Sequence, residues 1–180
     1  MFAGLFNKRA RPSDDRGEAI YAAIVAAARR PELYRDLGAP DSLPGRFELI
    51  VLHAALALRR LRREATQDAA ALGQSVFDAM VRTLDANLRE IGVGDLSVPK
   101  RMKAMAQSFY DGAKAYDAAL DAGDEEMLAK ALDKNVFGGA SPAAALRLAR
   151  YAVRADADLA ARPVDGAGWP AFPPVEEARS

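Results

Sequence analysis

The sequence predicts an all-α protein, a single-domain helical bundle of about six helices with an extended, Pro/Gly-rich C-terminal tail. Apolar residues make up 51% of the 180 residues, which is enough for one buried core. Apolar side chains recur every three or four residues, and no stretch alternates with the period of two that strands require. Alanine is abundant and β-branched residues are few, which also favours helix.

The first helix is expected to begin at Ser13, a typical N-cap residue, and to turn Ile20 and Ile24 inward. Pro31 should end this helix or open a short second turn. The stretch "GAPDSLPG" at residues 38–45 consists of turn-forming residues and predicts a loop.

The next helix, residues 46–64, is apolar nearly all round over residues 47–58, which places it at the centre of the bundle. His53 lies among leucines, one position beside the main apolar stripe. A hydrogen-bonded core histidine is the expected state, and a lone metal or haem ligand or a partner contact are the alternatives. The helix ends in "RRLRR" at residues 59–63, which predicts a solvated basic face.

Two longer helices should follow, over residues 68–91 and 98–122, with Gly92 and Gly123 at their C-terminal ends. Gly112 lies on the inward stripe of the second one, where glycine weakens a helix by about 1 kcal/mol relative to alanine. We interpret it as a position where another backbone comes close, against the alternative of a tolerated defect.

The last two helices are predicted from Asp124 to about residue 137 and from Ser141 onward. Residues 162–180 carry too many prolines and glycines for a helix, and Trp169 and Phe172 either dock on the body or stay loose. The predicted organisation is an N-terminal apolar and basic segment (1–12), a helical domain (13–161) and the tail (162–180).

Several function classes are excluded or disfavoured by composition. The chain has no cysteine and one histidine, so thiolate sites and His-pair metal sites cannot form within it. Balanced charge, 25 basic against 25 acidic residues, disfavours a nucleic-acid binder, and the basic runs "RRLRR" and "KRMK" lack interleaved aromatic residues. We find no catalytic constellation, metal site or cofactor loop. Tyr110, Lys114 and Asp117 share one helix face, and we expect Tyr110 and Asp117 to join His53 in one polar cluster.

The N-terminal "MFAGLFNKRARP" combines apolar residues with cations that follow them. It is too short to span a bilayer and has the wrong order for a signal peptide. It is either a frayed terminus or a weak membrane-surface segment, with apolar groups in the interface and cations on the headgroups. The candidate membrane-surface residues are Phe2, Leu5, Phe6, Lys8, Arg9 and Arg11.

Three stretches in order, "FELIVLHAALALRRLRRE", "KRMKAMAQSFYDGAKAYDAAL" and "LAKALDKNVFG", resemble the ubiquinol–cytochrome c chaperone family, bacterial relatives of the mitochondrial cytochrome b assembly factor. The resemblance covers roughly residues 33–155. It departs from the mitochondrial relatives at Ala54, Ala55 and Ala57, where those have large aromatic residues. By this resemblance the candidate partner-binding residues are His53, Phe109, Tyr110, Tyr116, Asp117, Asn135 and Phe137.

The resemblance implies a non-enzymatic assembly chaperone in the bacterial cytoplasm or at the inner face of the membrane. Its partner would be a membrane-protein client, cytochrome b or another subunit of the cytochrome bc complex, with weak contact to anionic membranes and none to nucleic acid. The alternative is a helical ligand-binding or adaptor domain with a pocket at His53, Tyr110 and Asp117. A chaperone predicts an open apolar groove or flat patch, and a ligand binder predicts a closed cavity.

Overall fold

A computed structural model describes residues 15–164, 169 and 171–175. The regular secondary structure of these residues consists of helices, joined by turns and loops. The helices are α1 (Asp15–Ala28), α2 (Pro31–Arg35), α3 (Leu43–Arg63), α4 (Gln67–Glu90), α5 (Val98–Ala122), α6 (Glu125–Val136) and α7 (Pro142–Ala160). Helix α2 has five residues, and the other helices in this part of the chain have 12 or more, so the predicted fold class is confirmed.

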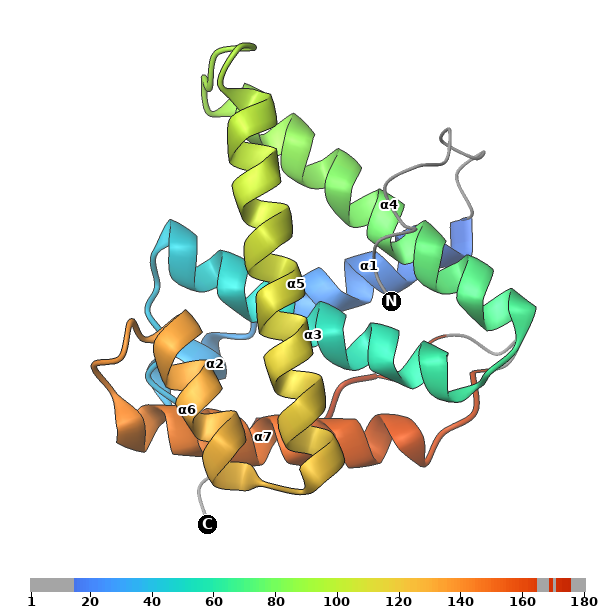
Figure 1. The fold of residues 1–180 in the computed structure, drawn as a ribbon, viewed down its shortest axis with the longest axis vertical. Helices are drawn as coiled ribbons and strands as arrows, with labels where there is room; N and C mark the ends of the chain where they lie inside the picture. Colours follow the sequence, from blue (N-terminus) through green and yellow to red (C-terminus); the bar gives the residue numbers. More distant parts are fainter. Residues whose placement is uncertain (1–14, 165–168, 170, 176–180) are drawn as a thin grey trace.

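Helix α3 lies at the centre of the fold, as its apolar sequence predicts (Figure 1). It contacts α1, α4, α5, α6 and α7, and every residue from Leu49 to Leu61 is buried. Helices α6 and α7 pack on each other along one side of α3, and α1 packs across α3 and α4 on another. A helix covered on so many sides must be apolar nearly all round, which explains the composition of residues 47–58.

Helices α4 and α5 form a hairpin that projects from this body (Figure 1). They meet at the loop 91–97 and diverge toward the body, where α3 and α1 cross them. Gly92 follows the end of α4 with φ +84°, a left-handed conformation that glycine adopts without strain. The angle between the two diverging helices is the structural basis of the groove described below.

Side-chain caps mark the starts of α3, α4 and α6. The Thr66 hydroxyl accepts the Ala69 amide at 3.1 Å, and the Asp124 carboxylate accepts the Met127 amide at 2.8 Å. Helix α3 begins three residues earlier than predicted, because the Ser42 hydroxyl accepts the Gly45 amide at 3.2 Å and a proline stands in the first turn. The predicted loop 38–45 is therefore wrong for its last three residues.

Gly112 lies where α5 passes α3, but the atoms nearest to it belong to side chains and not, as predicted, to another backbone. A Cβ atom on Gly112 would lie 3.3 Å from Val51 Cγ1 on α3 and 3.5 Å from Asn135 Nδ2 on α6. The missing side chain therefore lets three helices pack closely at one point, which offsets the low helix propensity of glycine.

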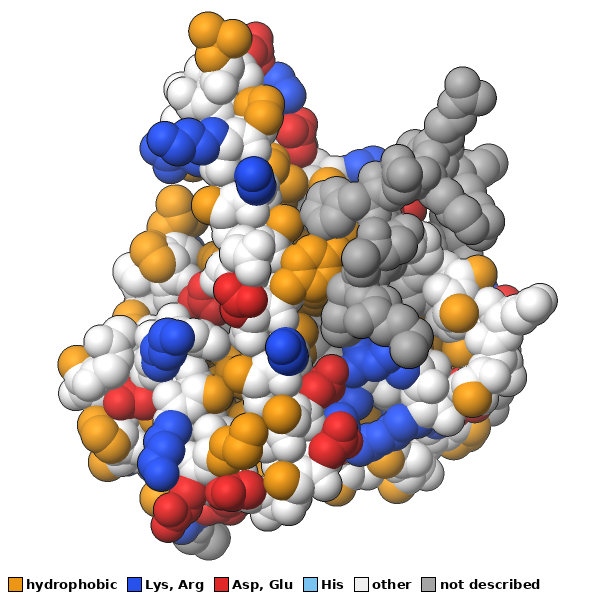
Figure 2. All heavy atoms as spheres, viewed as in Figure 1, with side chains coloured by type: hydrophobic (Ala, Val, Ile, Leu, Met, Phe, Trp, Pro, Cys, Tyr) orange, Lys and Arg blue, Asp and Glu red, His pale blue; other side chains and the backbone are white. Residues whose placement is uncertain are grey.

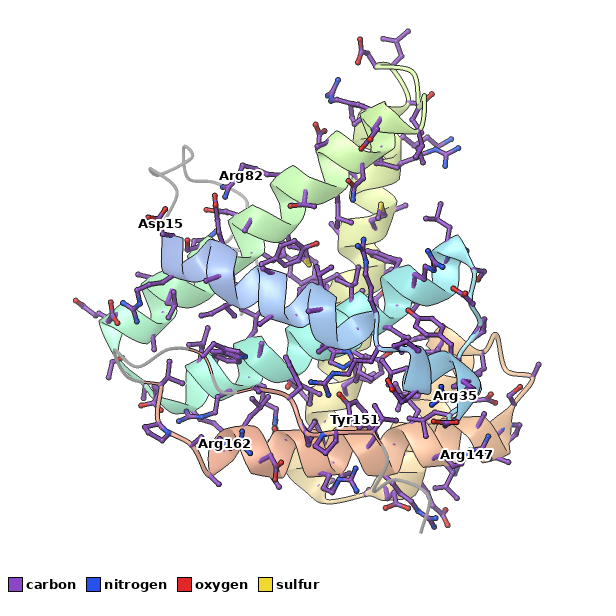
Figure 3. The ribbon with its side chains drawn as sticks, turned by 180° about the vertical axis from the view of Figure 1, so that it is seen from behind. Asp15, Arg35, Arg82, Arg147, Tyr151 and Arg162 are labelled. Atoms are coloured by element: carbon purple, nitrogen blue, oxygen red, sulfur yellow. The ribbon has the colours of Figure 1, made fainter. Side chains whose placement is uncertain are left out.

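The described part of the tail docks on the body. Phe172 and Val175 are buried, and the Arg30 guanidinium donates to the carbonyl oxygens of Phe172 at 3.0 Å and Pro173 at 2.5 Å. Arg162, just past α7, donates to the Ala171 carbonyl oxygen at 3.2 Å. Seen from behind, this segment runs back along α7 (Figure 3). Docking, rather than a loose tail, is thus the outcome for residues 171–175.

Candidate functional site

His53 is a fully buried, hydrogen-bonded histidine, as predicted. Its Nδ1 lies 2.7 Å from the Leu49 carbonyl oxygen and its Nε2 lies 2.9 Å from the Tyr151 hydroxyl. A carbonyl can only accept, so Nδ1 carries the proton and the Tyr151 hydroxyl donates to Nε2. The Phe172 ring covers the imidazole at 5.0 Å between ring centroids. Burial lowers the pKa of His53 to about 4, which keeps the ring neutral.

Asp117 belongs to an ion-pair network between α3, α5 and α7. Arg59 contacts Asp117 at 3.4 Å, Asp121 at 2.6 Å and Asp156 at 3.2 Å, and Arg62 also pairs with Asp117. Burial raises the pKa of the Asp117 carboxyl above its ordinary value, and the charges of Arg62 and Arg59 oppose this shift.

The prediction that residues 59–63 form a solvated basic face is wrong for two of the four arginines. Arg59 and Arg60 are only 7% and 6% exposed. Arg60 donates to the carbonyl oxygens of Leu159 at 2.6 Å and Arg162 at 2.8 Å, so it ties the end of α7 to α3. The physical reason is that α7 and the residues after it cover this side of α3 and supply the anions and carbonyls that buried guanidinium groups require.

Tyr110 lies in a third environment, half-buried between α4 and α5. Its ring stacks on Phe77 of α4 with 6.0 Å between centroids and contacts the ring of Phe109 at 5.6 Å. The predicted polar cluster of His53, Tyr110 and Asp117 is therefore wrong. Tyr110 and Asp117 are seven residues apart, about 10 Å along a helix, and His53 faces α7 rather than α5.

The remaining candidate partner-binding residues are largely internal. Tyr116 is buried and its hydroxyl accepts from the Asn135 side-chain amide at 3.2 Å, which joins α5 to α6. Phe109 and Phe137 are buried in the core. Packing and hydrogen bonding account for these residue types. Of the candidate partner-binding residues, Phe109 and Tyr110 line a groove.

That groove lies in the angle between α4 and α5 and has a volume of about 960 Å³. Both helices contribute to it, together with Phe47 near the start of α3. Its apolar lining consists of Phe47, Phe77, Met80, Val81, Leu84, Val98, Pro99, Met102, Met105, Ala106, Phe109 and Tyr110. Hydrophobic side chains are visible along α5 and at the end of the hairpin (Figure 2).

Four charged residues also line the groove. They are Arg82, Asp85, Arg89 and Lys103, and Arg89 pairs with Asp85 at 2.7 Å. Methionine side chains from both helices make up part of the wall, and methionine adapts its shape to different apolar surfaces. The arrangement can hold an apolar segment and offers no set of groups for acid–base or nucleophilic chemistry.

The apolar stripes of the two long helices predicted over residues 68–91 and 98–122 include Met80, Met102 and Met105, and this pattern predicts that all three face the core. Met80 is buried, as that pattern predicts, whereas Met102 and Met105 are only half-buried, and all three line the groove. The available signal was the gathering of unbranched, adaptable methionine on two adjacent helices.

Residues 15–164, 169 and 171–175 contain no group of three His, Asp or Glu side chains placed to hold a metal ion. No helix in this part of the chain is long and apolar enough to cross a membrane. The candidate membrane-surface residues within 1–12 lie outside the described residues.

Comparison with known proteins identifies the family. The sequence profile described as ubiquinol-cytochrome C chaperone matches residues 35–166, well over half of the chain. The chain belongs to this family. Among solved structures, the crystal structure of the Cbp3 homolog from Brucella abortus is similar, with a TM-score of 0.80 and 35% sequence identity, covering 98% of this chain and 99% of that chain. No curated protein matches.

For a member of the ubiquinol–cytochrome c chaperone family, the open apolar groove is the kind of surface that the sequence led us to expect. The alternative, a ligand binder, required a closed cavity shared by His53, Tyr110 and Asp117. The three residues lie in separate environments in the described structure, so no such site is formed there.

Proposed function

We propose that this protein is a non-enzymatic assembly chaperone for a membrane-embedded subunit of ubiquinol–cytochrome c reductase, with cytochrome b as the first candidate client. The family to which the chain belongs supports the chaperone role. In this proposal, residues 13–161 form the chaperone domain, which works in the bacterial cytoplasm at the inner face of the membrane.

The observation that carries the proposal is the groove between α4 and α5. An α-helix with side chains is about 10–12 Å across, and apolar helices bind other proteins by laying one face into a hydrophobic groove. A newly made membrane protein exposes apolar helical segments before it is assembled, and water disfavours their exposure. The groove offers aromatic, methionine and aliphatic side chains to such a segment, and apolar residues outnumber the four charged residues of its lining.

The test replaces apolar groove side chains by polar ones of similar length in the full chain. Met102→Gln/Met105→Gln removes apolar contact from the α5 wall of the groove, and we expect a loss of about 2 kcal/mol of binding free energy, roughly thirtyfold. The matched control is Met127→Gln, because Met127 is an exposed methionine on α6 outside the groove.

The measurement is the amount of cytochrome b that co-purifies with each tagged variant from detergent-solubilised membranes of cells making the reductase. Circular dichroism of each variant checks that the helices are intact. We expect the parent and Met127→Gln to retain the client and the groove variant to lose it. Equal recovery of cytochrome b with both variants would place the client elsewhere on the chaperone.

A further inference from the structure

The loop at the end of the α4–α5 hairpin exposes large aliphatic side chains to solvent. Leu96 is 99% exposed and Ile91 is 60% exposed, although both belong to a residue type that is normally buried. Because this loop is the most distant part of the hairpin from the body, a flat surface could reach it without steric obstruction (Figure 1).

Three cations follow this loop at the start of α5. Lys100, Arg101 and Lys103 are exposed, and none of them forms an ion pair with the residues that the structure describes. The cation at the end of α4, Arg89, is instead paired with acidic residues, Asp85 on the same helix and Asp95 in the loop. At about 3.6 residues per turn the three cations point to different sides of the first turns of α5, and Figure 2 shows Lys and Arg side chains at several places around the hairpin end.

We infer that the hairpin end, residues 91–103, is a membrane-surface contact that inserts Ile91 and Leu96 among lipid headgroups and places the three α5 cations on anionic phosphates. The spacing fits such a contact. At 1.5 Å per residue, the cations lie about 3 to 8 Å along α5 from its first residue, Val98, and Leu96 precedes that residue in the loop. This separation is similar to the depth of about 5–10 Å to which apolar side chains enter the interface.

An anionic lipid surface explains the two features together better than other partners do. Single-stranded nucleic acid is usually bound by cations with aromatic rings among them, and residues 91–103 contain no aromatic residue. An acidic protein would account for the cations but not for a leucine held fully in water beyond them. Residues 85–103 carry four basic and three acidic residues, so the contact is weak and sensitive to salt.

The contact also orients the chaperone. Val98, Pro99 and Lys103 belong both to the hairpin end and to the lining of the groove. A hairpin end resting on the membrane therefore brings the groove to the bilayer surface, where a membrane protein emerges. This consequence does not depend on which protein the groove binds.

The first experiment reports on the position of Leu96 itself. Because the chain has no cysteine, Leu96→Cys can carry one environment-sensitive fluorophore in the full-length protein, and Lys130→Cys on α6 provides the matched control site. With vesicles of phosphatidylglycerol and phosphatidylcholine, we expect a blue shift and an intensity increase at position 96 only. No change at position 96 on vesicles that do bind the protein would overturn the inference and assign the contact to another segment.

The second experiment measures vesicle affinity by co-sedimentation at low salt. Lys100→Gln/Arg101→Gln/Lys103→Gln should weaken binding about a hundredfold, at about fivefold per charge. The control Lys114→Gln/Lys130→Gln/Lys134→Gln removes the same net charge from exposed positions nearer the body and should change affinity less than about twofold, since salt screens distant charges. Equal effects of the two triple variants would show a response to net charge alone and would refute a site at the hairpin end.

Discussion

His53 should make the protein less stable as the pH falls, because the fold can hold this side chain only in its neutral form. The ring is fully buried and accepts a hydrogen bond from Tyr151. The positive charge of Arg30 further disfavours a protonated, positively charged imidazole. Burial is the main cause that lowers its pKa from the ordinary 6.5 to about 4, and Arg30 lowers it further while the bond to the Leu49 carbonyl opposes the shift.

The size and sign of the effect follow from this pKa difference. Below pH 6.5 the unfolded chain takes up a proton at His53, whereas the folded chain does so only near pH 4. The unfolded state therefore gains free energy from protonation across this window, and each pKa unit corresponds to about 1.4 kcal/mol. His53 should thus lower the free energy of unfolding by about 3 kcal/mol between pH 7 and pH 4.

Urea denaturation at a series of pH values measures this contribution when a variant without the titrating group is compared with the parent. His53→Leu/Tyr151→Phe replaces the hydrogen-bonded pair by two apolar side chains of similar size, so that no buried hydroxyl is left without a partner. Glu48 and Asp117, whose pKa values are raised by burial, titrate in both proteins and cancel in the comparison.

We expect the stability of the parent relative to this double variant to fall by about 3 kcal/mol from pH 7 to pH 4. The Tyr151 hydroxyl does not titrate in this range, because burial raises its pKa to about 12. A stability difference that stays constant over the whole range would show that His53 takes up its proton equally in both states. The reasoning from burial and hydrogen bonding would then fail.

Two further predictions concern close packing and buried charge. Gly112→Leu should lower the free energy of unfolding by about 1–3 kcal/mol, because α3 and α6 leave no room for the leucine side chain. Gly17→Ala should destabilise the protein more than Gly112→Ala does, because a Cβ atom on residue 17 would lie only 2.9 Å from the backbone of α4. Thermal melts of the three variants measure these losses. A Gly112→Leu variant as stable as the parent would contradict the first prediction, and a larger loss for Gly112→Ala than for Gly17→Ala would contradict the second. Arg59→Met should lower the free energy of unfolding by about 2–4 kcal/mol, because it removes a charge partner from two largely buried carboxylates. Arg62 is more exposed, so Arg62→Met should lower it by only about 0–1 kcal/mol. Urea denaturation measures both losses, and equal losses would contradict the idea that burial makes Arg59 the more important of the two.

The helices could be predicted from the sequence because their signals are local. The apolar period of three to four residues, the cap residue Asp124 and the stop at Gly123 each act within one or two turns. The start of α3 was missed for a related reason. Residues 42–45 contain turn formers, and the same serine and proline that favour a turn also cap and open a helix.

The polar interior could not be predicted, because its partners are far apart in the chain. His53 bonds to Tyr151, which is 98 residues away, and Arg59 pairs with Asp156, which is 97 residues away. Spacing on one helix shows which side chains share a face but not which other helix will cover that face. The cluster of His53, Tyr110 and Asp117 was wrong on this account, and so was the solvated face at residues 59–63.

The groove was beyond sequence reasoning for a third reason, which is also the basis of the proposed function. An apolar stripe on a helix is the same in sequence whether a neighbouring helix covers it or diverges from it. The hydrogen bonds of His53 and the ion pairs of Arg59 join α3 to α5 and α7. Arg60 holds the end of α7, and Arg162 holds the tail at Ala171. The far half of the α4–α5 hairpin lies outside this network, so its apolar stripes can stay open toward a partner while the body keeps the hairpin in place.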